Sequence, residues 1–313
     1  MILTVSLNPL LEKTLFFENI KNSEVNRASS VLINAGGKGI NVSRQLNYLS
    51  IDNLATGFLG GDSGKRLKSI LYKENIKNSF LQIKSETREG FVVVRNQIEQ
   101  TSFFEPDPLI TRNEVDEFIE RTKRSILNSE MVIFSGSAPT NPAGEDCTRI
   151  FTELISYGNE NDKFTIVDTY GQNLSSIYSA KPKIAHANIK EIETSLGKSL
   201  VTEVNVLSFL RSKEIEGIKI FILTDGEKPF FAMNQKYLYR IEPMKVDAVN
   251  PTGSGDAFMA GLIFGLHNNL PFEEILKFAT VCGSLNASMM EVCRVPQDEI
   301  EKNLSLVKVH KLN

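Results

Sequence analysis

The sequence is poor in cysteine and histidine, the residues on which disulfide frameworks, zinc sites and many nucleophilic sites depend. Its 313 residues include three of each. The cysteines, at positions 147, 282 and 293, are odd in number and show no C-x-x-C spacing, so neither a disulfide framework nor a zinc site is indicated. His186, His267 and His310 are scattered, so no Ser/His/Asp or Cys/His arrangement is indicated either. We expect each histidine to lie at the surface or to be satisfied by its neighbours.

The sequence also lacks a strong charge of either sign and a long apolar run. A net charge of −3 and a pI of about 5.8 provide no basic surface for nucleic acid or an anionic membrane. The longest uncharged apolar run, 257–266, has ten residues, whereas a membrane span needs about 18, so we expect a core helix there. Residues 1–7 show neither the charged head nor the cleavage site of a signal peptide, and we expect a cytoplasmic protein.

From about residue 110 the pattern predicts alternating helices and buried strands. Helices are expected at 113–127 and 144–157, and strands at 131–135, 164–168 and 218–224, each ending in polar or glycine residues. This alternation predicts an α/β fold with a mostly parallel sheet flanked by helices, and ligands bound at the carboxyl ends of the strands. With 41% hydrophobic and 23% charged residues, the chain is large enough for one main core and a small appendage.

Four strand-like segments suggest what the appendage is. They cover residues 14–17, 30–33, 90–94 and 101–104. A helix-strand-helix pattern lies between the two pairs, so the four segments could form a small separate sheet. We expect it to have one apolar face, formed by Phe16, Phe17, Phe91, Phe103 and Phe104. That face would need cover from a substrate, the main domain or a second copy of the sheet. Hairpins belonging to the main core fit the same periodicity equally well.

The stretch 247–266 combines a chain break, two glycines and an acidic residue. Asn250-Pro251 ends the preceding element, and Gly253 and Gly255 precede the uncharged run, which predicts a loop that leads into a buried helix. Such a helix start exposes backbone amides, and the missing Cβ atoms let an anion such as phosphate come close. Asp256 would repel that anion, so its presence suggests a base that takes a proton from an attacking hydroxyl. Taken alone, Asp256 also fits a helix cap.

A second glycine-rich turn, Gly36-Gly37-Lys38-Gly39, opens another predicted helix. Together with Asn41 in the first turn it suits an anionic or multiply hydroxylated ligand, and it equally suits a tight turn without a ligand. Standard nucleotide motifs do not account for these glycines. Gly64-Lys65 lacks the other Walker A residues, Phe258 breaks a G-x-G-x-x-G pattern, and no H-R-D or D-F-G set occurs.

The two glycine motifs together resemble the signatures of the ribokinase-like (PfkB) carbohydrate kinases. They are Gly36-Gly37-Lys38-Gly39-x-Asn41 and the run from Asn250 to Phe258, and they occur in the right order and separation, with matching elements between them over nearly the whole chain. Residues 4–9, Asn26-Arg27, 86–88 and 135–137 resemble the branch that phosphorylates sugar phosphates, which includes fructose-1-phosphate kinase and tagatose-6-phosphate kinase.

This resemblance implies a fold and an activity. The chain would be one ribokinase-like domain over residues 1–313, with a lid sheet built from about 10–33 and 88–106 that in relatives often serves as a dimer contact. It would use ATP and Mg²⁺ to phosphorylate a ketohexose phosphate. The expected reaction converts fructose 1-phosphate to the 1,6-bisphosphate, with tagatose 6-phosphate as the alternative substrate. A sensor that binds nucleotide or sugar phosphate without turnover is a second alternative, and a kinase of nucleosides or unphosphorylated sugars is a third.

The resemblance also implies roles for individual residues. Asp256 would take the proton, while the amides of Gly253, Ser254 and Gly255 would hold the charge on the transferred phosphoryl group. The implied substrate residues are Glu12, Arg27, Gly36, Gly37, Lys38, Asn41, Arg88 and Ser137. The implied nucleotide residues are Lys183, Asn188, Thr224, Gly226, Thr252, Gly253, Gly255 and Asn286.

Some of these residues are assigned to ionic partners. Arg27, Lys38 and Arg88 are the candidates for the phosphate that the substrate carries, because a guanidinium fork can bind phosphate through two bonds. Both arginines would otherwise be surface charges. Asn188 and Glu191 match an N-x-x-E motif that orders Mg²⁺, and one helical turn places both on one face. A solvated helix face explains that tetrad equally well when it is taken alone.

Four departures from the family pattern bear on specificity. Glu12 stands where this branch usually has Asp, and Asp107 replaces a glycine near the lid. His186-Ala187 replaces the usual Lys-Pro before Asn188, and Pro229 stands where a second glycine often follows Gly226. We therefore expect catalysis to be kept and the fit of the sugar, the nucleotide and the lid to differ.

Overall fold

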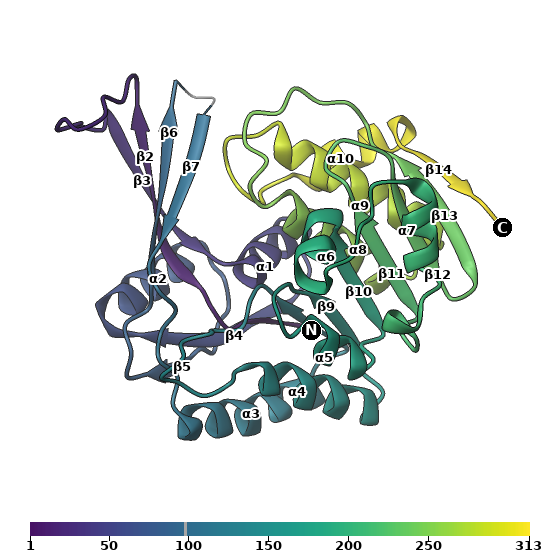
Figure 1. Cartoon of the computed structure of the whole chain (residues 1–313), viewed down its shortest axis with the longest axis horizontal. Helices are drawn as coiled ribbons and strands as arrows, with labels where there is room; N and C mark the ends of the chain where they lie inside the picture. The colour runs from purple at the N-terminus through teal and green to yellow at the C-terminus, as the bar shows by residue number, and fades with distance from the viewer. Residues whose placement is uncertain (97–98) are drawn as a thin grey trace.

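The computed structural model describes residues 1–96 and 99–313, and in that part of the chain a ten-stranded sheet forms the centre of the molecule. Its strand order is β14-β13-β12-β11-β10-β9-β8-β1-β4-β5 (Figure 1). From β5 to β11 neighbouring strands are parallel, and β12, β13 and β14 are added antiparallel. The strands are β1 (Ile2–Ser6), β4 (Asn53–Gly60), β5 (Leu81–Ile83), β8 (Met131–Ser135), β9 (Phe164–Asp168), β10 (Ile184–Asn188), β11 (Ile220–Thr224), β12 (Phe230–Asn234), β13 (Tyr237–Glu242) and β14 (Lys308–Lys311). The predicted α/β class with a mostly parallel sheet is confirmed.

Helices cover both faces of this sheet because strand side chains alternate between two apolar cores. In β1, Leu3 and Val5 belong to one core and Ile2 to the other. The first core is closed by α3 (Arg112–Leu127), α4 (Thr148–Glu160), α5 (Leu174–Ser179), α6 (Ile189–Leu196) and α7 (Glu203–Phe209). The second is closed by α1 (Lys38–Tyr48), α8 (Ser254–His267), α9 (Phe272–Ala287) and α10 (Gln297–Asn303).

The uncharged run near the C-terminus forms α8, which is buried along most of its length as predicted. Gly261 and Gly265 face α9 so closely that an added Cβ would come within 2.8 Å of Ala279 and Ile275 respectively. This close packing fixes α8 against α9. Among the described residues, no helix combines the length and the apolarity that a bilayer crossing requires.

A second, four-stranded sheet stands apart from the main body, with the order β3-β2-β6-β7 (Figure 1). Its strands are β2 (Leu10–Phe17), β3 (Ser30–Gly36), β6 (Glu89–Arg95) and β7 (Glu99–Phe104). The predicted separate sheet, here called the lid sheet, is therefore confirmed, and the hairpins of a common core are not. Residues 97–98, part of the lid expected at 88–106, lie outside the described residues. Helix α2 (Gly61–Lys73) packs under the base of the lid sheet, with Leu67 and Leu71 against Leu11 and Ala35.

The prediction of a single apolar face on the lid sheet is wrong. Neighbouring residues of a strand point to opposite faces, so Phe16 and Phe17 cannot share one. The register pairs Gly90 with both Glu12 and Phe104, which places Phe104 and Phe16 on the face that carries Glu12. Phe17, Phe91 and Phe103 lie on the opposite face.

The start of α4 also differs from the expected one. The helix begins at Thr148 instead of at 144, because polar side chains hold the preceding residues in turns. Asn141 accepts a hydrogen bond from the amide of Ala143, and Asp146 accepts one from the amide of Thr148. These turns form part of the loop that follows β8, at the carboxyl edge of the sheet.

Candidate active site

Two glycine-rich segments far apart in the sequence meet beside the carboxyl end of β1. Gly37 precedes α1 and lies against Ser6, the last residue of that strand. Gly253 precedes α8, which packs against α1. Across 215 residues of sequence, Asn41 Nδ2 donates a hydrogen bond of 2.8 Å to Asp256 Oδ2. The two residues that the glycine motifs singled out are therefore in direct contact.

The backbone at the start of α8 requires glycine at position 253. Its φ of 76° is left-handed, and a Cβ there would come within 2.4 Å of Val292 Cγ1. Fully buried Asn286 holds this loop, donating at 2.9 Å to the Thr252 carbonyl and at 3.2 Å to Ser254 Oγ. Asn286 therefore braces the loop that carries Thr252 and Ser254, and its contact with a nucleotide stays a prediction. The first amides of α8 are left without partners inside the helix.

Asp256 is a buried carboxylate, only 5% exposed, in the first turn of α8. Burial raises the pKa of its carboxyl to about 7, against the opposing effects of Lys38 and the hydrogen bond from Asn41. A group with such a pKa is suited to accept a proton near neutral pH. The alternative that Asp256 is the helix cap is wrong, because Gly253 is the N-cap and no side chain caps α8.

Lys38 lies at the centre of a cluster of charges near Asp256. Its Nζ is 2.9 Å from Glu191 Oε1 and 3.3 Å from Asp168 Oδ1. Burial disfavours the charge of Lys38, but these carboxylates outweigh it and raise its pKa above the ordinary value. Burial also disfavours the charge of Asp168, yet Lys38 and His186 hold its pKa well below its usual range. The cluster thus keeps a protonated ammonium group near the buried carboxyl of Asp256.

His186 joins this cluster to the end of β11. Its Nδ1 lies 2.9 Å from Asp168 Oδ1 and its Nε2 lies 3.1 Å from Thr224 Oγ1. The ring stacks on Phe258 with centroids 5.4 Å apart. His186 is the satisfied kind of histidine that the sequence led us to expect, and it engages the hydroxyl of Thr224, a predicted nucleotide residue. Gly226, with φ 61°, has no atom within 4 Å of where a Cβ would be.

The two predicted metal residues form a reciprocal cap at the start of α6. Asn188 Oδ1 accepts from the Glu191 amide at 2.8 Å, and Glu191 Oε2 accepts from the Asn188 amide at 2.9 Å. The other oxygen of Glu191 pairs with Lys38. In residues 1–96 and 99–313, no group of three or more His, Cys, Asp or Glu side chains is placed to hold a metal ion. One carboxylate and one amide oxygen still fit Mg²⁺, which binds proteins through one or two carboxylates together with phosphates and water.

Arg44 fixes the orientation of Asn41. Its Nη1 donates to Asn41 Oδ1 at 2.6 Å, and because a guanidinium has no acceptor, the NH₂ end of the amide must face Asp256. Glu74 holds Arg44 through Nε at 2.9 Å and takes a second ion pair of 2.8 Å from Arg294. This chain of contacts connects the end of α2 and the loop between α9 and α10 to the buried carboxylate of Asp256.

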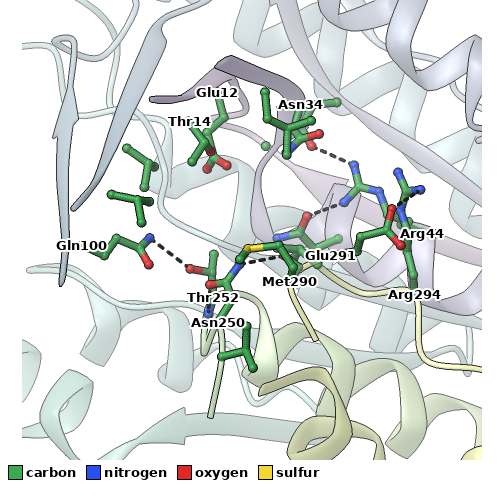
Figure 2. Close-up of a pocket in the computed structure, with 18 of the residues that line it drawn as sticks. Glu12, Thr14, Asn34, Arg44, Gln100, Asn250, Thr252, Met290, Glu291 and Arg294 are labelled. Atoms are coloured by element: carbon green, nitrogen blue, oxygen red, sulfur yellow. Dashed lines mark hydrogen bonds and ion pairs between the residues drawn. The ribbon is translucent and has the colours of Figure 1, made fainter. Parts of the chain in front are cut away.

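A pocket lies between the lid sheet and the main body. Figure 2 shows Glu12 and Asn34 of the lid strands on one side, with Asn250 and Thr252 on the other. Burial raises the pKa of Glu12, and Arg44 opposes that rise. The predicted site residues that line this pocket are Glu12, Gly36, Asn41 and Thr252.

Two more predicted substrate residues meet around Asn8, at the end of β1. Arg88 Nη2 donates to the Asn8 carbonyl at 3.1 Å, and Asn8 Nδ2 donates to Ser137 Oγ at 3.4 Å. The side chain of Arg88 is 14% exposed and is paired with Asp107, so it is not an ordinary surface charge.

Arg27 and Lys183 lie away from these groups. Arg27 is exposed between β2 and β3 and does not line the pocket. Lys183 precedes β10, and its Nζ is 5.2 Å from the ring of Phe164, the first residue of β9. β10 ends at Asn188, so Lys183 lies at the amino edge of the sheet, about 16 Å from the carboxyl edge at roughly 3.3 Å per residue. The prediction that Lys183 meets nucleotide phosphates is therefore wrong.

Three charged residues of the site carry no expectation from the sequence. Asp168 ends a buried parallel strand, which is itself a signal for a site residue. Arg44 follows Asn41 by one helical turn in α1. No local pattern predicts the contact of Arg294 with Glu74, because the two residues are 220 positions apart in the sequence.

Known proteins resemble this chain along its length. A family model described as the pfkB family carbohydrate kinases matches residues 8–298. A tagatose-6-phosphate kinase from Staphylococcus epidermidis is 31% identical over 315 aligned positions, covering 99% of this chain and 100% of that protein. The solved structure of a possible 1-phosphofructokinase from Thermotoga maritima has a TM-score of 0.89 and 26% identity, covering 100% of this chain and 99% of the other. Ribokinase from Giardia lamblia, at 16% identity, has a TM-score of 0.80, covering 97% of this chain and 98% of the other, and so shares the ribokinase-like fold.

Proposed function

The chain belongs to the PfkB family of carbohydrate kinases, and on this basis we propose that it transfers the γ-phosphoryl group of ATP to a hydroxyl of a ketohexose phosphate. The observation that carries the proposal is the buried carboxylate of Asp256, held by Asn41 in the first turn of α8, whose first amides have no partner inside the helix. The Ser254 amide donates to the Pro251 carbonyl at 3.2 Å, just outside the helix. Phosphoryl transfer needs a group that accepts the proton of the attacking hydroxyl and donors that hold the charge of the phosphoryl group.

In the proposed reaction, Asp256 takes the proton of the sugar hydroxyl as that oxygen attacks. Its pKa of about 7 lets it be ionised near neutral pH and still bind the proton it receives. The amides of Gly253, Ser254 and Gly255 hold the negative charge of the transferred group, the kind of stabilisation that is worth several kcal/mol in a dry site. Lys38 adds a positive charge that its carboxylate partners keep protonated.

The nucleotide occupies the carboxyl edge of the sheet in this proposal. Thr224 ends β11 at that edge and Gly226 follows it, and the open space where a Cβ of Gly226 would stand suits the approach of a ligand. Thr252, the third residue assigned to the nucleotide, precedes α8 and lines the pocket under the lid sheet. Mg²⁺, when bound, neutralises phosphate charge. Asn188 and Glu191 would hold it, and Glu191 would then have to share its oxygens with Lys38.

The acceptor occupies the pocket under the lid sheet. Glu12, Asn41 and the backbone at Gly36 line this pocket and bind hydroxyls together with the backbone at Gly37. Arg88 and Lys38, which are not part of the pocket lining, bind the phosphate that the substrate already carries. We propose fructose 1-phosphate as the first substrate, giving fructose 1,6-bisphosphate. Tagatose 6-phosphate is the second candidate, and the name of the Staphylococcus epidermidis relative favours it.

A coupled assay of ADP release over a panel of sugar phosphates tests the proposal. The panel contains fructose 1-phosphate, fructose 6-phosphate, tagatose 6-phosphate and the free ketohexoses, each with ATP and Mg²⁺. We expect turnover with fructose 1-phosphate or tagatose 6-phosphate and much weaker turnover with free sugars. Binding of a sugar phosphate without ADP release would instead favour a sensor, for which Glu12 and Pro229 are the motivating departures.

A further inference from the structure

Asp107 pairs with Arg88, a predicted substrate residue, and is held by three loops. Asp107 Oδ1 accepts from Asn8 Nδ2 at 2.7 Å and from Arg88 Nη1 at 3.1 Å. Its Oδ2 accepts from the amide of Thr140 at 2.8 Å and from the hydroxyl of Thr140 at 3.0 Å. Both carboxylate oxygens are thus fixed by donors from the loops after β1, β5 and β8.

Both terminal nitrogens of the Arg88 guanidinium are hydrogen-bonded to neighbouring residues of the protein. One terminal nitrogen pairs with Asp107 and the other donates to the Asn8 carbonyl at 3.1 Å. Its face lies over the ring of Phe104, with Cζ 5.6 Å from the centroid. The side chains of Arg88 and Asp107 are 14% and 18% exposed, so water screens the pair only weakly. The remaining nitrogen of the guanidinium, Nε, is buried and has no hydrogen-bond partner within the described part of the chain.

A phosphate that approaches Arg88 therefore meets a fixed carboxylate on the same guanidinium. The two anions compete for one fork of donors, and repulsion between them grows as the site excludes water. A neutral hydroxyl in the same place meets no such repulsion. The cost falls on the phosphate of the substrate and not on its ring hydroxyls.

We propose that Asp107 is a specificity-determining residue that weakens the binding of the substrate's phosphate at Arg88 and so narrows the preference of this enzyme for phosphorylated over free sugars. The inference rests on the proposed function, in which Arg88 meets that phosphate. It also gives a physical meaning to one departure from the family pattern, since a glycine at 107 would leave Arg88 free.

Equilibrium binding without nucleotide measures this preference independently of turnover. Titration calorimetry with fructose 1-phosphate, tagatose 6-phosphate and fructose is compared for the wild type and for Asp107→Asn. We expect Asp107→Asn to tighten the binding of the sugar phosphate by roughly tenfold, since it removes one repelling charge, and to leave fructose and ATP unchanged. Asp116→Asn on α3, which removes an equal charge from an ion pair with Arg149 of α4, is the matched control and should change none of these values.

A second background separates a direct effect from a general loosening of the loops. In Arg88→Leu, the further change Asp107→Asn should give no tightening, because the shared partner is gone. If Asp107→Asn unfolds, Asp107→Gly serves instead, with melting temperatures measured for every variant. Unchanged or weaker binding of sugar phosphates in the folded Asp107 variants overturns the inference, and so does a tightening that persists without Arg88. If the wild type releases no ADP, only the proposed function is contradicted. The ratio of the affinities for sugar phosphate and for fructose still decides the role of Asp107.

Discussion

At the scale of the residue, the site depends on a carboxylate whose charge is opposed by its surroundings. Asp256 is buried against Asn41 and near Lys38, and these two groups compensate only part of the loss of water. The result is a carboxyl that binds a proton far more readily than an exposed aspartate does. That property is a disadvantage for an ion-pair partner and an advantage for a general base.

The pH dependence of kcat tests this property. Asp256 acts only when it is unprotonated, and burial raises its pKa to about 7, so kcat should be low below that pH and should rise through a limb centred near it. The measurement uses saturating substrates between about pH 5 and 9. Because a sugar phosphate titrates near pH 6, a control on the protein is needed.

Arg44→Met provides that control. It releases Asn41, weakens the hydrogen bond that favours the ionised form of Asp256 and should move the limb to higher pH. Ionisation of the substrate cannot produce such a shift. A flat wild-type profile, or a limb that stays in place in Arg44→Met, would contradict this account of Asp256.

Residue positions were predictable where a local pattern defines them. Asp256 and Asn41 stand at fixed distances from glycine-rich helix starts, and the structure brings both together. Lys183 was misplaced because the sequence does not show where β10 begins, and five residues of strand decide which edge of the sheet a side chain reaches. The contact that orients Asn41 depends on the pairing of Arg44 with Glu74, a tertiary contact without a local signal.

At the scale of the element, the start of α8 is the part on which the site is built. Its N-cap residue adopts a left-handed backbone, and the loop is braced by the amide of Asn286. The amides that follow point out of the helix without partners inside it. Their direction therefore depends on a conformation that only glycine adopts without strain at this position.

Gly253→Ala should damage this element in two ways. The left-handed backbone costs about 1–2 kcal/mol for a residue with a Cβ, and the new methyl would collide with Val292 at 2.4 Å. We expect lower stability in urea unfolding and a kcat reduced by about tenfold or more, because the amides lose their alignment. Gly197→Ala at the end of α6 is the matched control, since its φ is 63° and its surroundings are open. A variant at 253 that keeps its kcat while losing stability like the control would show that the loop conformation does not matter for catalysis.

Helices and strands were predictable where a run of apolar residues is bounded by polar residues or glycine. β8 and β9 have the expected bounds because short apolar runs are followed directly by polar residues or glycine. The start of α4 was placed too early because side-chain turns at Asn141 and Asp146 compete with the helix. The faces of the lid sheet were misassigned because strand alternation separates Phe16 from Phe17 however apolar the segment is.

At the scale of the whole molecule, the lid sheet has one face toward the pocket and one that the described chain leaves partly open. On the open face, Val31, Ile33 and Phe103 are 53%, 38% and 57% exposed. Phe91 and Leu15 lie on the same face by register. Lys13 lies between Ile33 and Phe91 on this face. Exposed apolar side chains on one face are typical of an interaction site, and we propose that a second copy of the lid sheet covers this face.

Phe103→Asp tests that proposal. A charge within a contact between two lid sheets should favour the monomer, whereas the wild type should sediment as a dimer in analytical ultracentrifugation. Val204→Asp on α7, at a position 75% exposed and away from the lid sheet (Figure 1), should leave the association unchanged. A wild-type monomer at micromolar concentration, or a Phe103→Asp protein that remains dimeric, would exclude this use of the face.

The most direct measurement of the central claim is the turnover of Asp256→Asn on the sugar phosphate that the wild type uses. The amide keeps the size of the side chain and a bond to Asn41 but cannot take the proton of the acceptor. If Asp256 is the general base, kcat should fall by about 10²-fold or more, while the affinity for ATP measured by calorimetry stays within about a factor of two of the wild type. Normal turnover in that variant would contradict the account.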